Sequence, residues 1–224
     1  SGLYITGKNN NKIIKLGDIR TNQEKKLLNY NDGTISPGKL WIGLSDKKEN
    51  KKIGYFGFIE NNNFIKIKNN FKVSNGPAID KKNKYFFLSD SASRTIYKYT
   101  FNKFKRRKFF EFSISQGYPD GIALDNEGGL WVAHWAGARV SRINKNGKID
   151  FSINLPALNI TSVTFVGKKL NYLFITSAKI DTSKRHLEKY IYSGSSFLLK
   201  TNFKGQSIPY ASIKMLKSIH HLQQ

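Results

Sequence analysis

Short runs of alternating apolar and polar residues dominate the sequence, and clusters of Gly, Asn, Asp and Lys separate them. The clearest series runs from Tyr118 to Asn144, where GIALD, LWVAHW and RVSRI are divided by NEGG and AGA. A fourth run, KIDFSINL, follows the turn at 145–147. Alternation over four to eight residues, broken by such turn formers, is typical of consecutive antiparallel strands. We therefore predict a four-stranded antiparallel sheet over residues 118–155.

The same order of turn, short strand, polar turn and strand recurs along the chain. Four polar residues occupy the same phase of this repeat, at separations of 44, 45 and 42 residues: Asn31, Asn75, Asp120 and Ser162. A four-stranded repeat of about 40–50 residues is the sequence signature of a β-propeller. We expect each of these residues to lie just before the innermost strand of its blade, so that all four converge at one mouth of the central channel.

Composition supports an all-β domain and narrows its chemistry. Aromatic residues make up 13% of the chain and cysteine is absent, so disulfides and thiolate chemistry are excluded. No apolar run is long enough to span a membrane. The chain does not begin with Met, so the natural N-terminus is expected to be missing; we expect a cytoplasmic protein, with the periplasm as the alternative.

The formal net charge is +23, from 38 Lys and Arg against 15 Asp and Glu. A field of this sign could bind nucleic acid or acidic membranes without specificity. The cations are mostly Lys scattered among Asn, as in KKENKK (47–52) and DKKNKY (80–85). This pattern favours codon bias over a designed patch, so we expect no specific nucleic-acid partner and no membrane partner.

The repeated polar positions carry two interpretations. Asn and Asp beside Gly are ordinary turn formers. Gathered at one mouth, a carboxylate and two amide oxygens also suit a hard divalent cation. His134 is expected to line the channel or to pack within it. Other polar and aromatic positions are interpreted as structural: Asp90, Asp125, Trp41, Trp131 and Trp135.

Three segments together resemble consecutive blades of one known family: SNGPAID…YFFLSDSASRTIYKYTF, YPDGIALDNEGGLWVAHWAGARVSRINKNG and TSVTFVGKKLNYLFITSA. The family is the gluconolactonase-like group, which includes senescence marker protein, regucalcin and lactonases. NDGTISPGKLWIG resembles its preceding blade, so the likeness runs from about Asn29 to Ser212. It implies a six-bladed propeller with one divalent cation in the channel. It also implies hydrolysis of the carboxylic ester bond of sugar lactones.

Carried over by position, the resemblance makes Asn75 and Asp120 metal ligands and Asp120 the general base. The metal is expected to be Ca²⁺, with Zn²⁺, Mg²⁺, Mn²⁺ and iron as alternatives. The bound metal would polarise the lactone carbonyl. Asn29 and His134 would contact the substrate, a small sugar lactone, and Asn31 would contact the substrate or a metal-bound water. We expect a monomer or a weak oligomer.

The chain departs from the family pattern in three places. The family's first metal ligand, a Glu in a Glu-Gly-Pro segment, has no counterpart here. The Arg that usually stands two positions before the Asn-Asp-Gly motif is Asn29, and the usual Gly-Thr-Met reads Gly43-Leu44-Ser45. We therefore expect one propeller domain over residues 1–212, lacking the first blade and part of the second, followed by a tail over 213–224. The alternative is a propeller that binds metal or ligand without catalysis.

Overall fold

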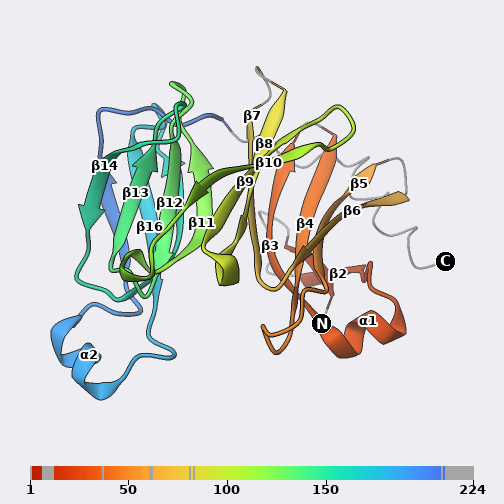
Figure 1. The fold of residues 1–224 in the computed structure, drawn as a ribbon, viewed down its shortest axis with the longest axis horizontal. Helices are drawn as coiled ribbons and strands as arrows, with labels where there is room; N and C mark the ends of the chain where they lie inside the picture. Colours follow the sequence, from red (N-terminus) through yellow and green to blue (C-terminus); the bar gives the residue numbers. More distant parts are fainter. Residues whose placement is uncertain are drawn as a thin grey trace. The chain divides into compact units, whose positions relative to one another are not determined.

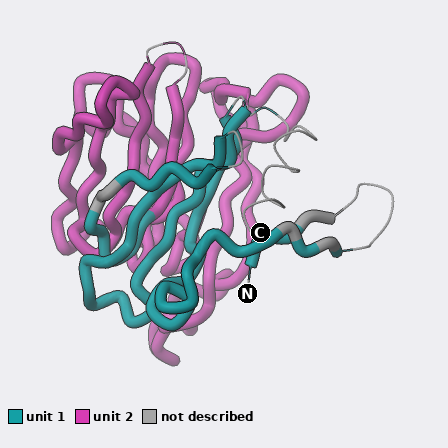
Figure 2. Tube along the Cα trace, turned by 90° about the vertical axis from the view of Figure 1, so that its right-hand side faces the viewer, with its two compact units in different colours: residues 1–74, 208–224 teal, residues 75–207 magenta. Residues whose placement is uncertain are grey.

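The computed structural model describes residues 2–6, 13–36, 38–60, 63–80, 82, 84–207 and 209. The predicted tail over 213–224 lies outside the described residues. The described chain is built almost wholly of antiparallel strands (Figure 1). The chain divides into two compact units, residues 1–74 with 208–224 and residues 75–207 (Figure 2).

The first unit contains a hairpin, a short helix and a four-stranded sheet. The hairpin pairs β1 (Leu3–Thr6) with β2 (Ile13–Gly17). Consecutive strands form the sheet in chain order: β3 (Leu28–Ser36), β4 (Lys39–Asp46), β5 (Gly54–Glu60) and β6 (Asn63–Phe71).

The helix α1 (Asn22–Leu27) was not predicted from the alternation pattern. A capping box begins it, because the hydroxyl of Thr21 accepts from the backbone of Glu24 and the Glu24 carboxylate accepts from the backbone of Thr21.

The second unit contains three consecutive sheets, and the strands of each follow chain order. The first sheet comprises β7 (Ser74–Asp80), β8 (Tyr85–Asp90), β9 (Thr95–Thr100) and β10 (Arg106–Glu111). The second comprises β11 (Tyr118–Leu124), β12 (Leu130–Trp135), β13 (Arg139–Ile143) and β14 (Ile149–Asn154). The third has three strands among the described residues: β15 (Asn159–Val166), β16 (Tyr172–Ala178) and β17 (Ser196–Lys200).

Three short helical segments connect these strands. They are η1 (Ser91–Ser93), η2 (Ile114–Gln116) and α2 (Lys184–Lys189). Helix α2 extends beyond the strand ends of the third sheet (Figure 1). None of the helices among the described residues has the length and apolar character needed to cross a membrane.

Apolar side chains from neighbouring sheets of the second unit form two cores. One joins the β7–β10 and β11–β14 sheets around Phe87, Ile96 and Val132. The other joins the β11–β14 and β15–β17 sheets around Trp131, Val163 and Ile175. Alternate residues of β12 therefore face opposite cores, as a strand with both faces covered requires.

These observations confirm an all-β fold of blade-like antiparallel sheets, including the four-stranded sheet predicted over residues 118–155. Trp41 and Trp131 are fully buried, as expected of packing residues. The placement of the four repeat residues just before their strands was wrong. Each lies inside a strand: Asn31 in β3, Asn75 in β7, Asp120 in β11 and Ser162 in β15. The six-blade count, the single domain over 1–212 and the missing first blade stay predictions.

Candidate functional site

Asp120 lies at an interruption of the β11 ladder. Strand β11 pairs Pro119 with His134 and then Ile122 with Val132, so the register shifts across Asp120 and Gly121. A β-bulge of this kind removes residues from regular pairing and redirects their side chains. The bulge explains why β11 begins earlier than predicted, because pairing resumes on its N-terminal side.

Gly121 is required at this bulge. A Cβ there would collide with the side chain of Ser162 on β15. The Pro-Asp-Gly sequence thus supplies a residue without a side chain exactly where two strands approach closely, and it leaves the Asp120 side chain partly exposed.

Asn75 is connected to Asp120 through Ser91. The Asn75 amide Nδ2 donates to Ser91 Oγ over 2.8 Å, and Ser91 Oγ donates to the Pro119 carbonyl over 2.5 Å. Ser89 Oγ donates to the same carbonyl over 3.0 Å. This carbonyl belongs to the peptide bond that Pro119 forms with Asp120. Ser91 thus connects the Asn75 side chain to the backbone directly before Asp120. The roles predicted for Asn75 and Asp120 as metal ligands stay predictions.

The donor set at this position is a carboxylate and a side-chain amide. The Asn75 side chain is 4% exposed, and its nitrogen is engaged by Ser91, so its oxygen is the atom suited to a cation. Both are hard oxygen donors, which fit Ca²⁺ or Mg²⁺ with water completing the shell. Among the described residues no group of three or more His, Asp and Glu side chains is gathered to hold a metal.

His134 is fully buried behind the bulge, as the direct partner of Pro119. Burial lowers the pKa of His134, the hydrogen bond with the Gln116 backbone raises it and the charge of Arg139 lowers it, which brings the pKa to about 4 in all. The imidazole is therefore neutral near pH 7, and Nδ1 donates to the Gln116 carbonyl over 2.7 Å. Its Nε2 is then an acceptor without a hydrogen-bond partner among the described residues. The predicted substrate contact of His134 stays a prediction.

Asn29 and Asn31 belong to the first unit. Both side chains are exposed on β3, and the β3 register shifts between Tyr30 and Gly33, as β11 does at Asp120. The Asn31 amide Nδ2 donates to the Ser74 carbonyl over 2.9 Å. The roles predicted for Asn29 and Asn31 stay predictions.

Arg94 is a cation that the sequence did not single out. It follows η1 with a φ of 53°, and its guanidinium lies 4.3 Å from the centre of the Tyr118 ring, two residues before Asp120. Its Nε is buried without a hydrogen-bond partner among the described residues. Arg94 belongs to no repeated motif. The tight turn after η1 sets its position, and a single sequence does not reveal that.

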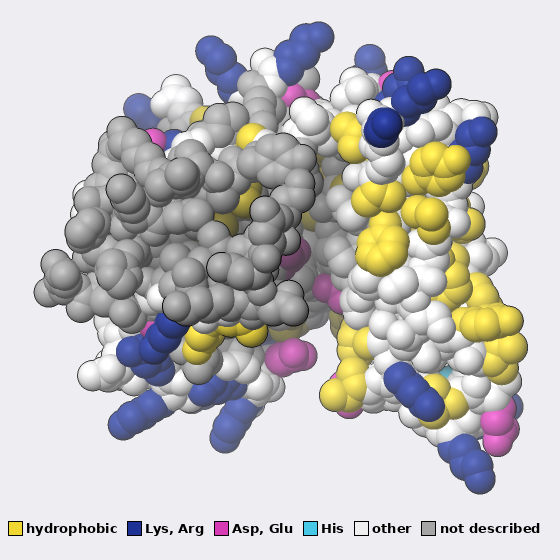
Figure 3. All heavy atoms as spheres, turned by 180° about the vertical axis from the view of Figure 1, so that it is seen from behind, with side chains coloured by type: hydrophobic (Ala, Val, Ile, Leu, Met, Phe, Trp, Pro, Cys, Tyr) yellow, Lys and Arg dark blue, Asp and Glu magenta, His cyan; other side chains and the backbone are white. Residues whose placement is uncertain are grey.

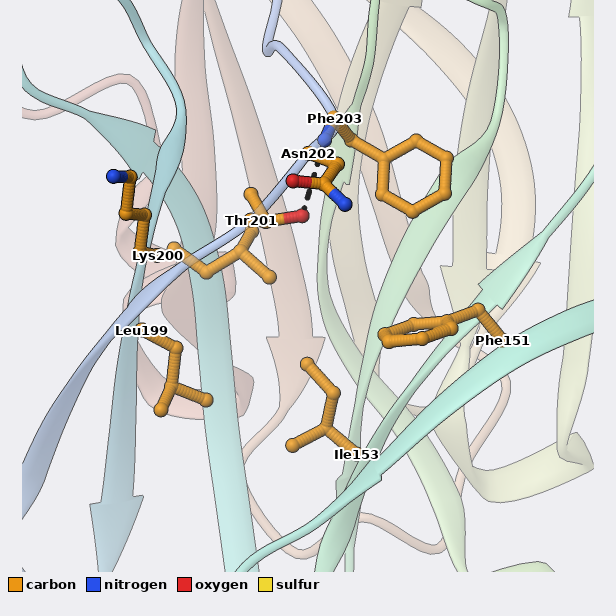
Figure 4. A pocket seen from close by; sticks show the side chains of 8 residues that line it. Phe151, Ile153, Leu199, Lys200, Thr201, Asn202 and Phe203 are labelled. Carbon is orange, nitrogen blue, oxygen red and sulfur yellow. Dashed lines mark hydrogen bonds between the residues drawn. The ribbon is translucent and has the colours of Figure 1, made fainter.

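A hollow of about 550 Å³ lies elsewhere in the second unit, between β14 and β17 (Figure 4). Its labelled side chains are mostly apolar, with Phe151 and Ile153 on one side and Leu199 on the other (Figure 4). Among the described residues that line it, Lys200 is the one charged side chain, and none carries a carboxylate or an imidazole. The described lining therefore does not compete with the Asp120 region as a hydrolytic site.

Known proteins resemble this chain in both sequence and fold. The sequence model of the SMP-30/Gluconolactonase/LRE-like region matches residues 1–179. A 6-deoxy-6-sulfogluconolactonase of Pseudomonas putida is 28% identical over 216 residues, which cover 93% of this chain and 74% of that protein. Regucalcin of Danio rerio is 29% identical over 184 residues, which cover 78% of this chain and 62% of that protein.

The structure also resembles that of a calcium-binding regucalcin from Agrobacterium tumefaciens. The TM-score is 0.84 at 20% sequence identity, and the match covers 93% of this chain and 72% of that protein. This likeness establishes a shared fold. The chain spans between 62% and 74% of the length of these three proteins.

Proposed function

Because the chain belongs to the SMP-30/gluconolactonase/LRE-like family, we propose that it hydrolyses the ester bond of a sugar lactone at Asp120. The observation that carries this proposal is the partly exposed Asp120, set in a bulge whose preceding carbonyl, that of Pro119, is linked through Ser91 to Asn75. Relatives named as lactonases support the choice of substrate class.

Asp120 and Asn75 would hold one divalent cation through their side-chain oxygens, with Ca²⁺ as the first candidate. A cation bound there would supply Lewis-acid polarisation of the lactone carbonyl.

The acid–base work falls to Asp120. Its carboxylate accepts a proton from the water that attacks the lactone carbonyl, and the ring-opened product leaves as an aldonate. The ester bond breaks between the carbonyl carbon and the ring oxygen, which takes up the proton that Asp120 received from the water. The hydroxyls of Ser89 and Ser91 fix the carbonyl before Asp120, so the carboxylate is held in place before substrate arrives.

Substrate orientation would rest on polar groups around this centre. Asn29 and Asn31 are candidates for contacts with sugar hydroxyls. Arg94 is the candidate for the cationic donor that Asn29 does not provide. His134 would act as a positioning residue, because its Nδ1 holds the Gln116 carbonyl and its strand position supports Pro119.

Hydrolysis of gluconolactone, followed as acid release in weak buffer with Ca²⁺ present, tests the proposal. Asp120→Asn is expected to lower kcat/KM by about 10²–10⁴-fold, the usual contribution of a general base. Glu49→Gln removes an exposed carboxylate in the first unit and serves as the matched control, with unchanged activity. Full activity in Asp120→Asn would refute the assignment.

A non-catalytic binding function is favoured by one observation, the lack of a Glu-Gly-Pro segment in the sequence. Calorimetric titration with Ca²⁺ separates the two functions. Binding that Asp120→Asn abolishes, without hydrolysis of any lactone in a panel of five- and six-membered rings, would establish binding alone.

A further inference from the structure

Residues of strands β8, β9 and β10 and of the β9–β10 turn line a basic hollow of about 350 Å³. It is at the Tyr85 end of β8, whereas the hydroxyls that hold Pro119 are at the other end. Strand β8 has six residues, so about 17 Å separates the two ends. Four cations and two hydroxyl-bearing residues line the hollow: Lys98, Lys105, Arg106, Arg107, Tyr85 and Thr100.

Two of these cations stand directly opposite each other. Lys98 on β9 pairs in register with Arg107 on β10, so both side chains project from the same face of the sheet. Like charges in directly opposed positions destabilise a sheet. Lys98 is also partly buried, with its Nζ 3.3 Å from the centre of the Tyr85 ring. A charged group is thus held in a hollow beside a second charge of the same sign.

Within the described residues, the contact of Lys98 with the Tyr85 ring offsets these charges only in part. No ion pair is recorded among them for Lys98, Lys105 or Arg107, whereas the neighbouring Lys108 pairs with Glu111 over 2.7 Å. Burial lowers the pKa of Lys98, and the charge of Arg107 lowers it further, against an opposing effect of Asp80. The positive charges that line the hollow are therefore not fully neutralised by the described residues, and an anion bound there would be stabilised.

Protection of a sheet edge does not account for this arrangement. Basic residues on an outer strand prevent pairing with other chains, and β10 is the outer strand of its sheet. That role suits Arg106, Arg107 and Lys108, which are all exposed on β10. Lys98 lies on β9, which is paired on both sides, so edge protection gives no reason for a cation there.

We propose that the hollow binds a phosphate group, either as free phosphate or as the phosphate of a small phosphorylated metabolite. A phosphate dianion is compact enough for the volume and carries the charge that two facing cations require. The guanidinium of Arg107 offers a planar pair of donors, and the ammonium of Lys98 supplies a point charge. The binding energy comes from relief of the repulsion between them.

Calorimetric titration with inorganic phosphate, at constant ionic strength set with chloride, tests the site. Lys98→Gln/Arg107→Gln is expected to weaken binding at least tenfold. Lys168→Gln/Lys169→Gln removes the same charge from exposed positions in the same unit and should bind as the unchanged protein does. The single variant Arg107→Gln alters an exposed side chain and covers the case in which the double variant does not fold.

A second titrant, glucose 6-phosphate, identifies the source of the phosphate. Glucose 6-phosphate binding tighter than inorganic phosphate indicates a phosphorylated metabolite, and equal affinities indicate free phosphate. Binding should also raise the pKa of the Lys98 ammonium, measured by NMR. The proposal fails if phosphate does not saturate, if both double variants lose affinity equally, or if oligodeoxythymidine alone binds in a salt-dependent manner.

Discussion

Two aspartates lie near opposite ends of strand β11, and they differ in burial. Asp125 follows the strand and is fully buried. Its Oδ1 accepts from the backbone of Glu127 and Gly129, and its Oδ2 accepts from the Trp131 indole and the Arg142 guanidinium. Asp120, in the bulge at the other end, is partly exposed. A carboxylate whose oxygens are all engaged by its own fold is structural, and one held at a surface bulge is suited to chemistry.

Arg142 extends the structural end of the blade. Besides Asp125 it pairs with Glu127 over 3.0 Å and Asp150 over 2.7 Å. Burial lowers the pKa of Arg142, but its hydrogen bond and charge interaction with Asp125 raise it overall. The interpretation of Asp125 as structural is therefore confirmed.

The largest effect on stability is expected at the closed end. Asp125→Asn leaves Arg142 without its buried counter-charge, which should cost about 3–5 kcal/mol of unfolding free energy. Urea denaturation followed by circular dichroism measures the loss. Asp181→Asn, at an exposed position, should stay within about 0.5 kcal/mol of the unchanged protein. Equal urea midpoints for Asp125→Asn and Asp181→Asn would contradict a structural role of Asp125.

The next effect concerns pH and His134. Its folded-state pKa of about 4 lies below the ordinary value of 6.5, so the unfolded chain binds a proton more readily. Stability from this group is complete above pH 6.5 and falls as the pH drops toward 4, by about 3 kcal/mol in all. Urea denaturation of the unchanged protein and of His134→Gln, from pH 7 to pH 4, isolates this contribution. Parallel pH profiles would contradict it.

A smaller loss is expected from a change to the bulge. Gly121→Ala introduces a Cβ that collides with Ser162, and overpacking of this kind costs about 1–3 kcal/mol. Adding Ser162→Gly should restore part of the loss, because it removes the two nearest atoms, Oγ and Cβ, while the Ser162 Cα stays 2.9 Å from the added Cβ. A double variant no more stable than Gly121→Ala would show that contact with the Ser162 side chain is not the cause.

The smallest effect is expected from Arg94. If its guanidinium orients the substrate, Arg94→Gln removes one charged hydrogen bond of about 1.5 kcal/mol, or roughly tenfold in KM, with kcat little changed. Steady-state hydrolysis of gluconolactone measures both constants. A fall in kcat at constant KM would instead place Arg94 in the chemical step.

The sequence was sufficient for the scaffold because periodicity is local. Alternation and turn formers located the strands of the 118–155 sheet, and the Asp-Asn-Glu-Gly turn marked Asp125 as structural. The contacts around the candidate site were harder to predict from the sequence. Ser89 and Ser91 act on a backbone carbonyl 30 and 28 residues away, which leaves no pattern in a single sequence. The bulge moved Asp120 into β11, because strand pairing across the Pro-Asp-Gly sequence depends on the partner strand.

The most direct test measures hydrolysis and unfolding together in Asp120→Asn. The account predicts that gluconolactone hydrolysis falls by about 10²–10⁴-fold while the urea midpoint stays unchanged, the reverse of the behaviour expected for Asp125→Asn. Full hydrolysis in Asp120→Asn, or a loss of stability as large as that of Asp125→Asn, would contradict the distinction between the two ends of the strand.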